Sequence, residues 1–212
     1  MSLDPHPLLE LLLEAARGRF PPADGGVSVL PPLPRGFEAS VGFTAHAVIA
    51  TALPAQDVLA HGADGYGGAV SPAFLRWLAG ANGVLDTLDL TLVKRAAHVV
   101  GRSAPPRRFD LDDHPRVRHA RWQRADVAVH GDERGLVTLS SGLAGRRELS
   151  IEVFGDGGRG AGRALLADAL ELIPDGEPVF AAVAAGNARS LRAFLALGFV
   201  PIGSEVMIQV GR

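Results

Sequence analysis

A glycine-dense turn is the part of this sequence whose residue types and spacing could do chemistry. Residues 155–163 read Gly-Asp-Gly-Gly-Arg-Gly-Ala-Gly-Arg and lie between an apolar extended stretch and an amphipathic helical pattern. Glycine permits positive φ and lets the backbone approach a ligand closely. The first turn of a following helix adds unpaired N–H groups and the positive end of the helix dipole. The segment therefore predicts a cradle for a diphosphate.

Two familiar classes of diphosphate site fit this turn poorly. A P-loop needs a lysine and a hydroxyl residue after the last glycine, whereas Gly162 is followed by Arg163-Ala164. The spacing Gly155-x-Gly157-x-x-Gly160 formally matches a dinucleotide fingerprint. That fold also needs an acidic residue after the next strand, where this chain has residues 184–186, Ala-Ala-Gly, and it needs several further βα units.

A second motif follows the turn. Residues 187–199 read Asn-Ala-Arg-Ser-Leu-Arg-Ala-Phe-Leu-Ala-Leu-Gly-Phe, a helix pattern that opens on asparagine and ends in Gly-Phe. This run and residues 158–166 resemble, in order and spacing, the acyl-CoA-binding motifs of the GNAT family of N-acetyltransferases. The resemblance covers about residues 126–212.

The resemblance implies acyl transfer from acetyl-CoA, or another acyl-CoA, to an amine of a small molecule or peptide. In this family one strand hydrogen-bonds the pantetheine arm, and the glycine turn holds the pyrophosphate through backbone N–H groups. A helix that opens on asparagine lies near the pantetheine or adenosine end, although Asn187 is equally well explained as an N-cap with Ser190 at N3. The implied cofactor-binding residues are Ile151, Val153, Gly158, Arg159, Gly160, Ala161, Gly162, Arg163, Asn187 and Ser190.

Two residues depart from the family pattern. The first position of the glycine motif usually holds Arg or Gln and is Gly157 here, and the preceding turn looks one residue short. The helix position that often holds a tyrosine, the proposed acid toward the leaving thiolate, is Phe194. These departures leave open a non-catalytic CoA-binding sensor of the same fold.

A base is needed because the attacking amine must be neutral. Glu148 and Glu152 share one face of their strand with Ser150, so that face could line a cleft, and Glu152 is nearer the glycine turn. We therefore predict Glu152 as the catalytic residue. The alternative is a solvated strand face, which β alternation alone produces.

Other polar residues carry weaker predictions. His119 and His130 could act as bases, but the histidines lack metal-ligand spacing, so no metal is expected. Four arginines and a tryptophan between residues 116 and 124 could bind an acidic substrate or CoA phosphates, or form a solvated helix face. They are Arg116, Arg118, Arg121, Arg124 and Trp122.

Composition limits the function classes. The chain has 212 residues, 47% of them hydrophobic, a formal charge of −2 and no cysteine. It therefore lacks the basic surplus expected for nucleic acid or an anionic membrane as partner, and the absence of cysteine fits a cytoplasmic location. Residues 8–16 are too short and too acidic for a signal or spanning segment and predict a docked helix with Asp4 as N-cap. A homodimer is an open alternative.

The predicted elements place these motifs in an α/β chain. A Pro/Gly-rich connector (19–36) precedes an atypical region of strand (41–51), helix (from Ser71-Pro72 to Asn82-Gly83) and strand (87–93). Strands at 126–130, 135–140 and 148–154 predict an antiparallel meander, followed by helix 160–173, strand 179–184, helix 187–198 and strand 204–210. We predict an N-terminal region (1–105) and a GNAT-like core (106–212), with a mixed, mostly antiparallel sheet flanked by helices.

Overall fold

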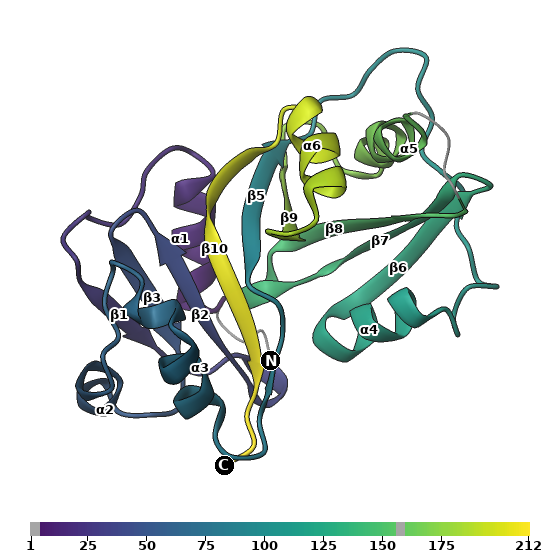
Figure 1. Cartoon of the computed structure of the whole chain (residues 1–212). Coiled ribbons are helices and arrows are strands. Elements are labelled where there is room, and N and C mark those ends of the chain that lie inside the picture. The colour runs from purple at the N-terminus through teal and green to yellow at the C-terminus, as the bar shows by residue number, and fades with distance from the viewer. Residues whose placement is uncertain (1–4, 156–159) are drawn as a thin grey trace. The chain divides into compact units, whose positions relative to one another are not determined.

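The computed structural model describes residues 5–155 and 160–212, which fold into two compact units (Figure 1). The first contains Met1–Thr91 and Ile202–Arg212, and the second contains Leu92–Pro201. Each unit is a mixed α/β structure with a mostly antiparallel sheet flanked by helices, so the predicted fold class is confirmed. The division predicted at residue 105 was drawn on composition and resemblance and stays a prediction.

The sheet of the first unit has the strand order β1-β3-β2-β10. β1 runs parallel to β3, whereas β2 pairs antiparallel with both β3 and β10, and β4 pairs with the end of β10. The strands are β1 (Val27–Leu30), β2 (Phe37–Phe43), β3 (His46–Ala50), β4 (Val84–Leu85) and β10 (Val200–Gln209), and β5 (Asp89–Arg95) begins in this unit.

Helices cover both faces of this sheet. Helices α2 (Ala55–Ala60) and α3 (Pro72–Ala79) bury Val58, Phe74 and Leu78 against one face, while α1 (Pro7–Ala15) lies on the other (Figure 1). The Ser71 side chain caps α3 as predicted, but the helix ends earlier than expected, at Gly80.

Three N-terminal expectations were wrong in detail. The strand predicted over 41–51 is a hairpin of β2 and β3, which turns at Thr44-Ala45 with Ala45 at φ 53°. The connector contains β1, because residues 27–30 pair with β3. The N-cap of α1 is His6, whose ring accepts a hydrogen bond from the Leu8 N–H; Asp4 lies outside the described residues.

The second unit carries the predicted meander. β6 (Ala125–Asp132), β7 (Gly135–Ser141) and β8 (Arg147–Val153) pair antiparallel, and β8 pairs parallel with β9 (Pro178–Ala184). Helix α4 (Pro115–Gln123) packs on β6 through Val117, and α5 (Ala161–Ala169) and α6 (Ala188–Ala196) pack together. The helix predicted over 160–173 ends earlier, at Ala169, and a 3₁₀ turn, Leu170–Leu172, follows it. The apolar residues predicted for its inner face are nevertheless buried: Leu165, Leu166, Ala169, Leu170 and Ile173. No helix in the described ranges is long and apolar enough to span a membrane.

Candidate functional site

The strand predicted to bind pantetheine, β8, separates from β9 toward its C-terminal end, next to the glycine turn. β7 pairs with β8 along the whole of β8, but the register between β8 and β9 is a single pair, Glu148 with Phe180. Within the described residues, Ile151 and Val153 lie beyond that pair and are half-buried. Their strand therefore has backbone groups on its β9 side that an extended ligand could bind.

The described part of the glycine turn opens α5. Gly160 is the N-cap residue with φ 92°, a conformation that favours glycine, and a Cβ built on it would meet no atom within 4 Å. Ala161, Gly162 and Arg163 form the first turn of the helix, where N–H groups lack partners within the helix. Gly157, Gly158 and Arg159 lie outside the described residues. The described turn thus has the open backbone that an anion cradle requires.

Gly162 also sets how closely α5 approaches β8. A Cβ built on this residue would lie 3.0 Å from Cγ2 of Val153 and 3.8 Å from Cδ1 of Ile151. The absence of a side chain at position 162 therefore lets the first turn of α5 rest on the two strand residues predicted to bind pantetheine.

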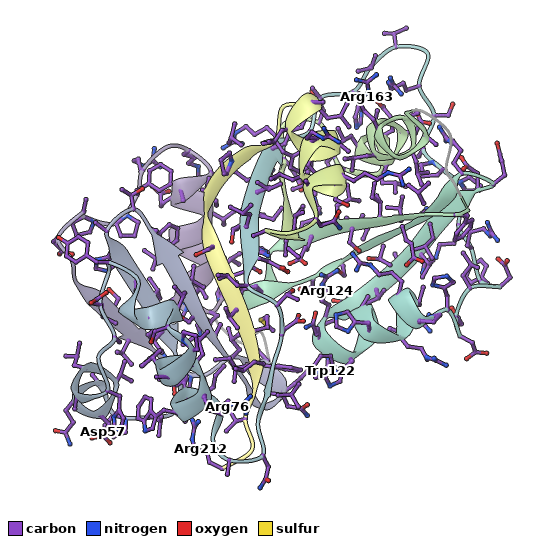
Figure 2. The ribbon with its side chains drawn as sticks, in the orientation of Figure 1. Asp57, Arg76, Trp122, Arg124, Arg163 and Arg212 are labelled. Carbon is purple, nitrogen blue, oxygen red and sulfur yellow. The ribbon has the colours of Figure 1, made fainter. Side chains whose placement is uncertain are left out.

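A pocket of about 460 Å³ adjoins this helix start. Its charged lining residues are Arg163 on α5 (Figure 2) and Arg102, which was not predicted from the sequence. Apolar lining comes from Ala164 and Ala167 of α5 and from Leu197 at the end of α6. Guanidinium groups beside a helix N-terminus are an arrangement that generally favours an anion such as a phosphate, although Arg102 is already paired with Asp168.

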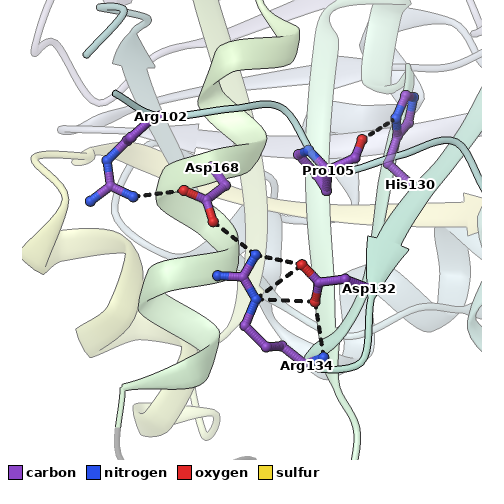
Figure 3. A network of polar contacts seen from close by, with 6 residues as sticks. All are labelled: Arg102, Pro105, His130, Asp132, Arg134 and Asp168. Atoms are coloured by element: carbon purple, nitrogen blue, oxygen red, sulfur yellow. Dashed lines mark hydrogen bonds and ion pairs between the residues drawn. The ribbon is translucent and has the colours of Figure 1, made fainter. Parts of the chain in front are cut away.

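An ion pair links the segment that carries Arg102 to α5, within a network around Asp168 (Figure 3). Arg102 Nη1 lies 2.7 Å from Asp168 Oδ1, and Arg134 Nη2 lies 2.8 Å from the other oxygen of the same carboxylate. Arg134 also binds Asp132 through its Nε, which raises the pKa of Arg134 and lowers that of Asp132. A second pocket of about 670 Å³ lies along residues 99–106 beside these groups. Arg102 lines both pockets.

The second predicted motif forms the helix it was expected to form. Asn187 caps α6 by accepting a hydrogen bond from the Ser190 N–H at 3.1 Å, so its N-cap role is confirmed. Asn187 is exposed, Ser190 is half-buried, and both lie at the end of α6 opposite Leu197. Phe194 is buried against Phe199, with ring centroids 4.9 Å apart. The contacts of Asn187 and Ser190 with CoA stay predictions.

The predicted base, Glu152, is 44% exposed and faces a histidine. His114 Nε2 lies 3.8 Å from Glu152 Oε1, while His114 Nδ1 accepts a hydrogen bond from the Arg116 N–H at the start of α4. Because Nδ1 is the acceptor, a neutral His114 carries its proton on Nε2, toward Glu152. His114 was not predicted from the sequence, where only His119 and His130 were candidates for an additional base.

Glu148 lies on the same strand face but in a different environment. It is buried, and its carboxylate binds Arg124 (2.6 Å) and Arg146 (2.8 Å), the latter fully buried under the Phe180 ring. Burial alone would raise the pKa of Glu148, but the two arginine charges outweigh it and lower that pKa. Gly142 leaves space for the carboxylate, which a Cβ there would contact. The alternative of a solvated strand face is therefore wrong for this residue.

The remaining polar candidates are bound elsewhere. His130 Nδ1 lies 3.0 Å from the Pro105 carbonyl, to which it donates, and His119 contacts Trp122. Arg121 pairs with Asp112, and Arg124, labelled in Figure 2, pairs with Glu148. The solvated-face interpretation of the basic stretch therefore does not hold for Arg124. In the described ranges, no three His, Asp or Glu side chains gather in a way that could hold a metal ion.

Comparisons with known proteins give a distant match. No protein-family model and no curated protein matches this chain. One similar solved structure, from Novosphingobium aromaticivorans DSM 12444, is described as a "Putative Acetyltransferase from the GNAT family". Its TM-score is 0.41 at 14% identity, over 61% of this chain and 68% of that chain. A similarity this low assigns neither family membership nor activity.

Proposed function

We propose that this protein is a GNAT-like acyltransferase that moves an acetyl or other acyl group from CoA to an amine of a small molecule or peptide. The observation that carries the proposal is the pocket at the start of α5, with Arg102 and Arg163 in its lining. It adjoins a helix whose first turn rests on β8, where β8 has parted from β9. The anion site suits the diphosphate of CoA, and the strand with unpaired backbone groups suits its pantetheine arm.

In this proposal the protein acts mainly through position and polarity. Backbone N–H groups of α5 and the two guanidinium groups bind the diphosphate, and β8 aligns the pantetheine arm beside its Ile151 and Val153 backbone. Holding thioester and amine together lowers the barrier by removing translational freedom. Glu152 accepts the amine proton directly or through one water, with the His114 N–H beside its carboxylate.

CoA should stabilise the protein, whereas NAD should not. At about 100 times its dissociation constant, CoA is expected to add about 2.7 kcal/mol to the free energy of unfolding, because it binds the folded state alone. Thermal shift with CoA, acetyl-CoA and NAD at matched concentrations measures this. Stabilisation by NAD without any by CoA would reject the proposal.

Glu152→Gln should slow turnover without weakening CoA binding. Loss of a general base typically costs about 10²–10⁴-fold in rate, and the half-exposed side chain contributes little to folding. Acetyl-CoA consumption over a panel of amines, beside CoA affinity by calorimetry, separates the two effects. Glu133→Gln, on the exposed turn between β6 and β7, is the matched control. Unchanged turnover in Glu152→Gln would remove that residue from the mechanism.

A non-catalytic CoA sensor is the second candidate. Phe194 favours it, because a phenyl ring cannot protonate a leaving thiolate, and this ring is buried against Phe199. An enzyme can still turn over slowly without that acid, since CoA leaves as a fairly stable thiolate. CoA binding with no turnover of any amine, in wild type and Phe194→Tyr alike, would favour the sensor.

A further inference from the structure

A Ser-His-Asp array lies in the first unit and contains no residue of the motifs described above. The Ser28 hydroxyl lies 3.0 Å from His46 Nε2, and His46 Nδ1 lies 2.9 Å from Asp24 Oδ1. His46 is buried, Ser28 is half-buried and Asp24 is exposed. The three residues come from β1, from the start of β3 and from the turn before β1.

The partners of His46 define its tautomer. A carboxylate only accepts, so Nδ1 carries the proton toward Asp24, and Nε2 is left to accept from the Ser28 hydroxyl. Asp24 is held in place by the Gly26 N–H at 2.7 Å, and the hydrogen bond from His46 is the largest cause that lowers the pKa of Asp24. The array therefore has the polarity of a nucleophile, a general base and an orienting carboxylate.

The surroundings of Ser28 also provide a place for a carbonyl oxygen. The Gly26 and Leu30 carbonyls accept from Ala47 and Thr51, so alternate backbone groups of β1 face β3. By this alternation the N–H groups of Val27 and Val29 point away from β3. Within the described strands β1 pairs with β3 alone. The N–H of Val29, the residue after Ser28, is thus available at a sheet edge to bind an oxyanion.

An apolar surface lies on the same side of the sheet. Phe43 is the register partner of His46, and its ring contacts Phe20, with centroids 6.4 Å apart. Phe20 is 47% exposed. Aromatic side chains on and against the strand next to His46 suit an ester with an apolar acyl or aryl group rather than a charged one.

We propose that Ser28, His46 and Asp24 form a second catalytic site, which hydrolyses small apolar carboxylic esters. The Ser28 oxygen bonds to the ester carbonyl carbon while its proton passes to His46 Nε2. The bond from that carbon to the alkoxy oxygen breaks, and the alcohol departs with the proton. A water then gives a proton to His46 Nε2 while its oxygen bonds to the acyl carbon. The bond from that carbon to the Ser28 oxygen breaks, the proton passes from His46 to the Ser28 oxygen, and the carboxylic acid is released.

A fluorophosphonate probe tests this site in the full chain. Intact mass and peptide mapping should show a single label, on Ser28, and p-nitrophenyl acetate should be hydrolysed. Ser28→Ala should abolish both signals, and His46→Gln and Asp24→Asn should slow labelling by about 10²-fold or more. Because Asp24 is exposed, Asp24→Asn should fold, and it therefore tests the activation of Ser28 even if His46→Gln does not fold. Ser141→Ala, at the end of β7, is the matched control and should label as wild type.

Three results would overturn the proposal. They are an unlabelled wild-type protein, a label that persists in Ser28→Ala, and labelling of Asp24→Asn at the wild-type rate. In each case the array would be a structural link between β1 and β3. CoA binding is proposed for the second unit and is measured separately. Failure of the esterase proposal would therefore leave the acyltransferase proposal standing, and the reverse also holds.

Discussion

Glu148→Ala is expected to lower the free energy of unfolding by about 3–5 kcal/mol, because it leaves two guanidinium groups without their shared carboxylate. Arg146 is 1% exposed, so its charge would be left with little solvation in place of that partner. Glu148→Gln should cost less, since its amide oxygen still accepts one hydrogen bond. Urea denaturation followed by tryptophan fluorescence measures the loss.

The matched control for this prediction is Glu152→Ala on the same strand face. Glu152 is half-exposed, and its removal should change stability by no more than about 0.5 kcal/mol. The pKa of Glu148 lies below its ordinary value of 4.5, so its contribution is present above that pH and is lost as the pH falls through the lower folded value. A loss under about 1 kcal/mol in Glu148→Ala would contradict the role given to the cluster.

Gly162→Val is expected to weaken CoA binding by about 5- to 150-fold, which corresponds to the 1–3 kcal/mol typical of overpacking. The new side chain would push Val153 and move the first turn of α5, whose N–H groups we assign to the diphosphate. Arg163→Ala removes an exposed charge and should cost at most about fivefold. Isothermal titration with CoA compares them.

Two further variants separate this steric cause from general damage. Gly162→Ala adds only a Cβ at 3.0 Å from Val153 and should give an intermediate loss. The double variant Gly162→Val/Val153→Ala provides space for the new side chain and should recover affinity relative to Gly162→Val. A loss in Arg163→Ala as large as in Gly162→Val would replace the backbone cradle by a side-chain clamp.

The sequence predicted those elements whose signals are local. The meander, α5 with its apolar face, and the Asn187 cap of α6 all follow from periodicity and capping within a few residues. The hairpin of β2 and β3 was missed because its turn has Ala45, not glycine or asparagine, at positive φ. β1 was missed because a four-residue segment among prolines becomes a strand only through parallel pairing with β3.

The site was less predictable, since its polar residues meet across the chain. The alternation of side chains along the strand correctly placed Glu148 and Glu152 on one face. It could not show that Glu148 is a buried ion-pair partner, because its partner Arg124 is distant in sequence. Arg102 reaches the α5 pocket from a segment that the sequence marks only as rich in proline, arginine and aspartate. His114 carried a signal that could have been used: it precedes Pro115 at the start of α4, the position of an N-cap.

The ion pair between Arg102 and Asp168 would couple phosphate binding at the α5 pocket to the ordering of residues 99–106. A phosphate that takes a hydrogen bond from Arg102 competes with a carboxylate already present at 2.7 Å. If this competition lowers the binding free energy of the ligand, binding must weaken the attachment of residues 99–106 to α5 by the same amount. Arg134 Nη2 lies 2.8 Å from the other oxygen of Asp168, so that carboxylate would keep a cationic partner if Arg102 turned to a ligand.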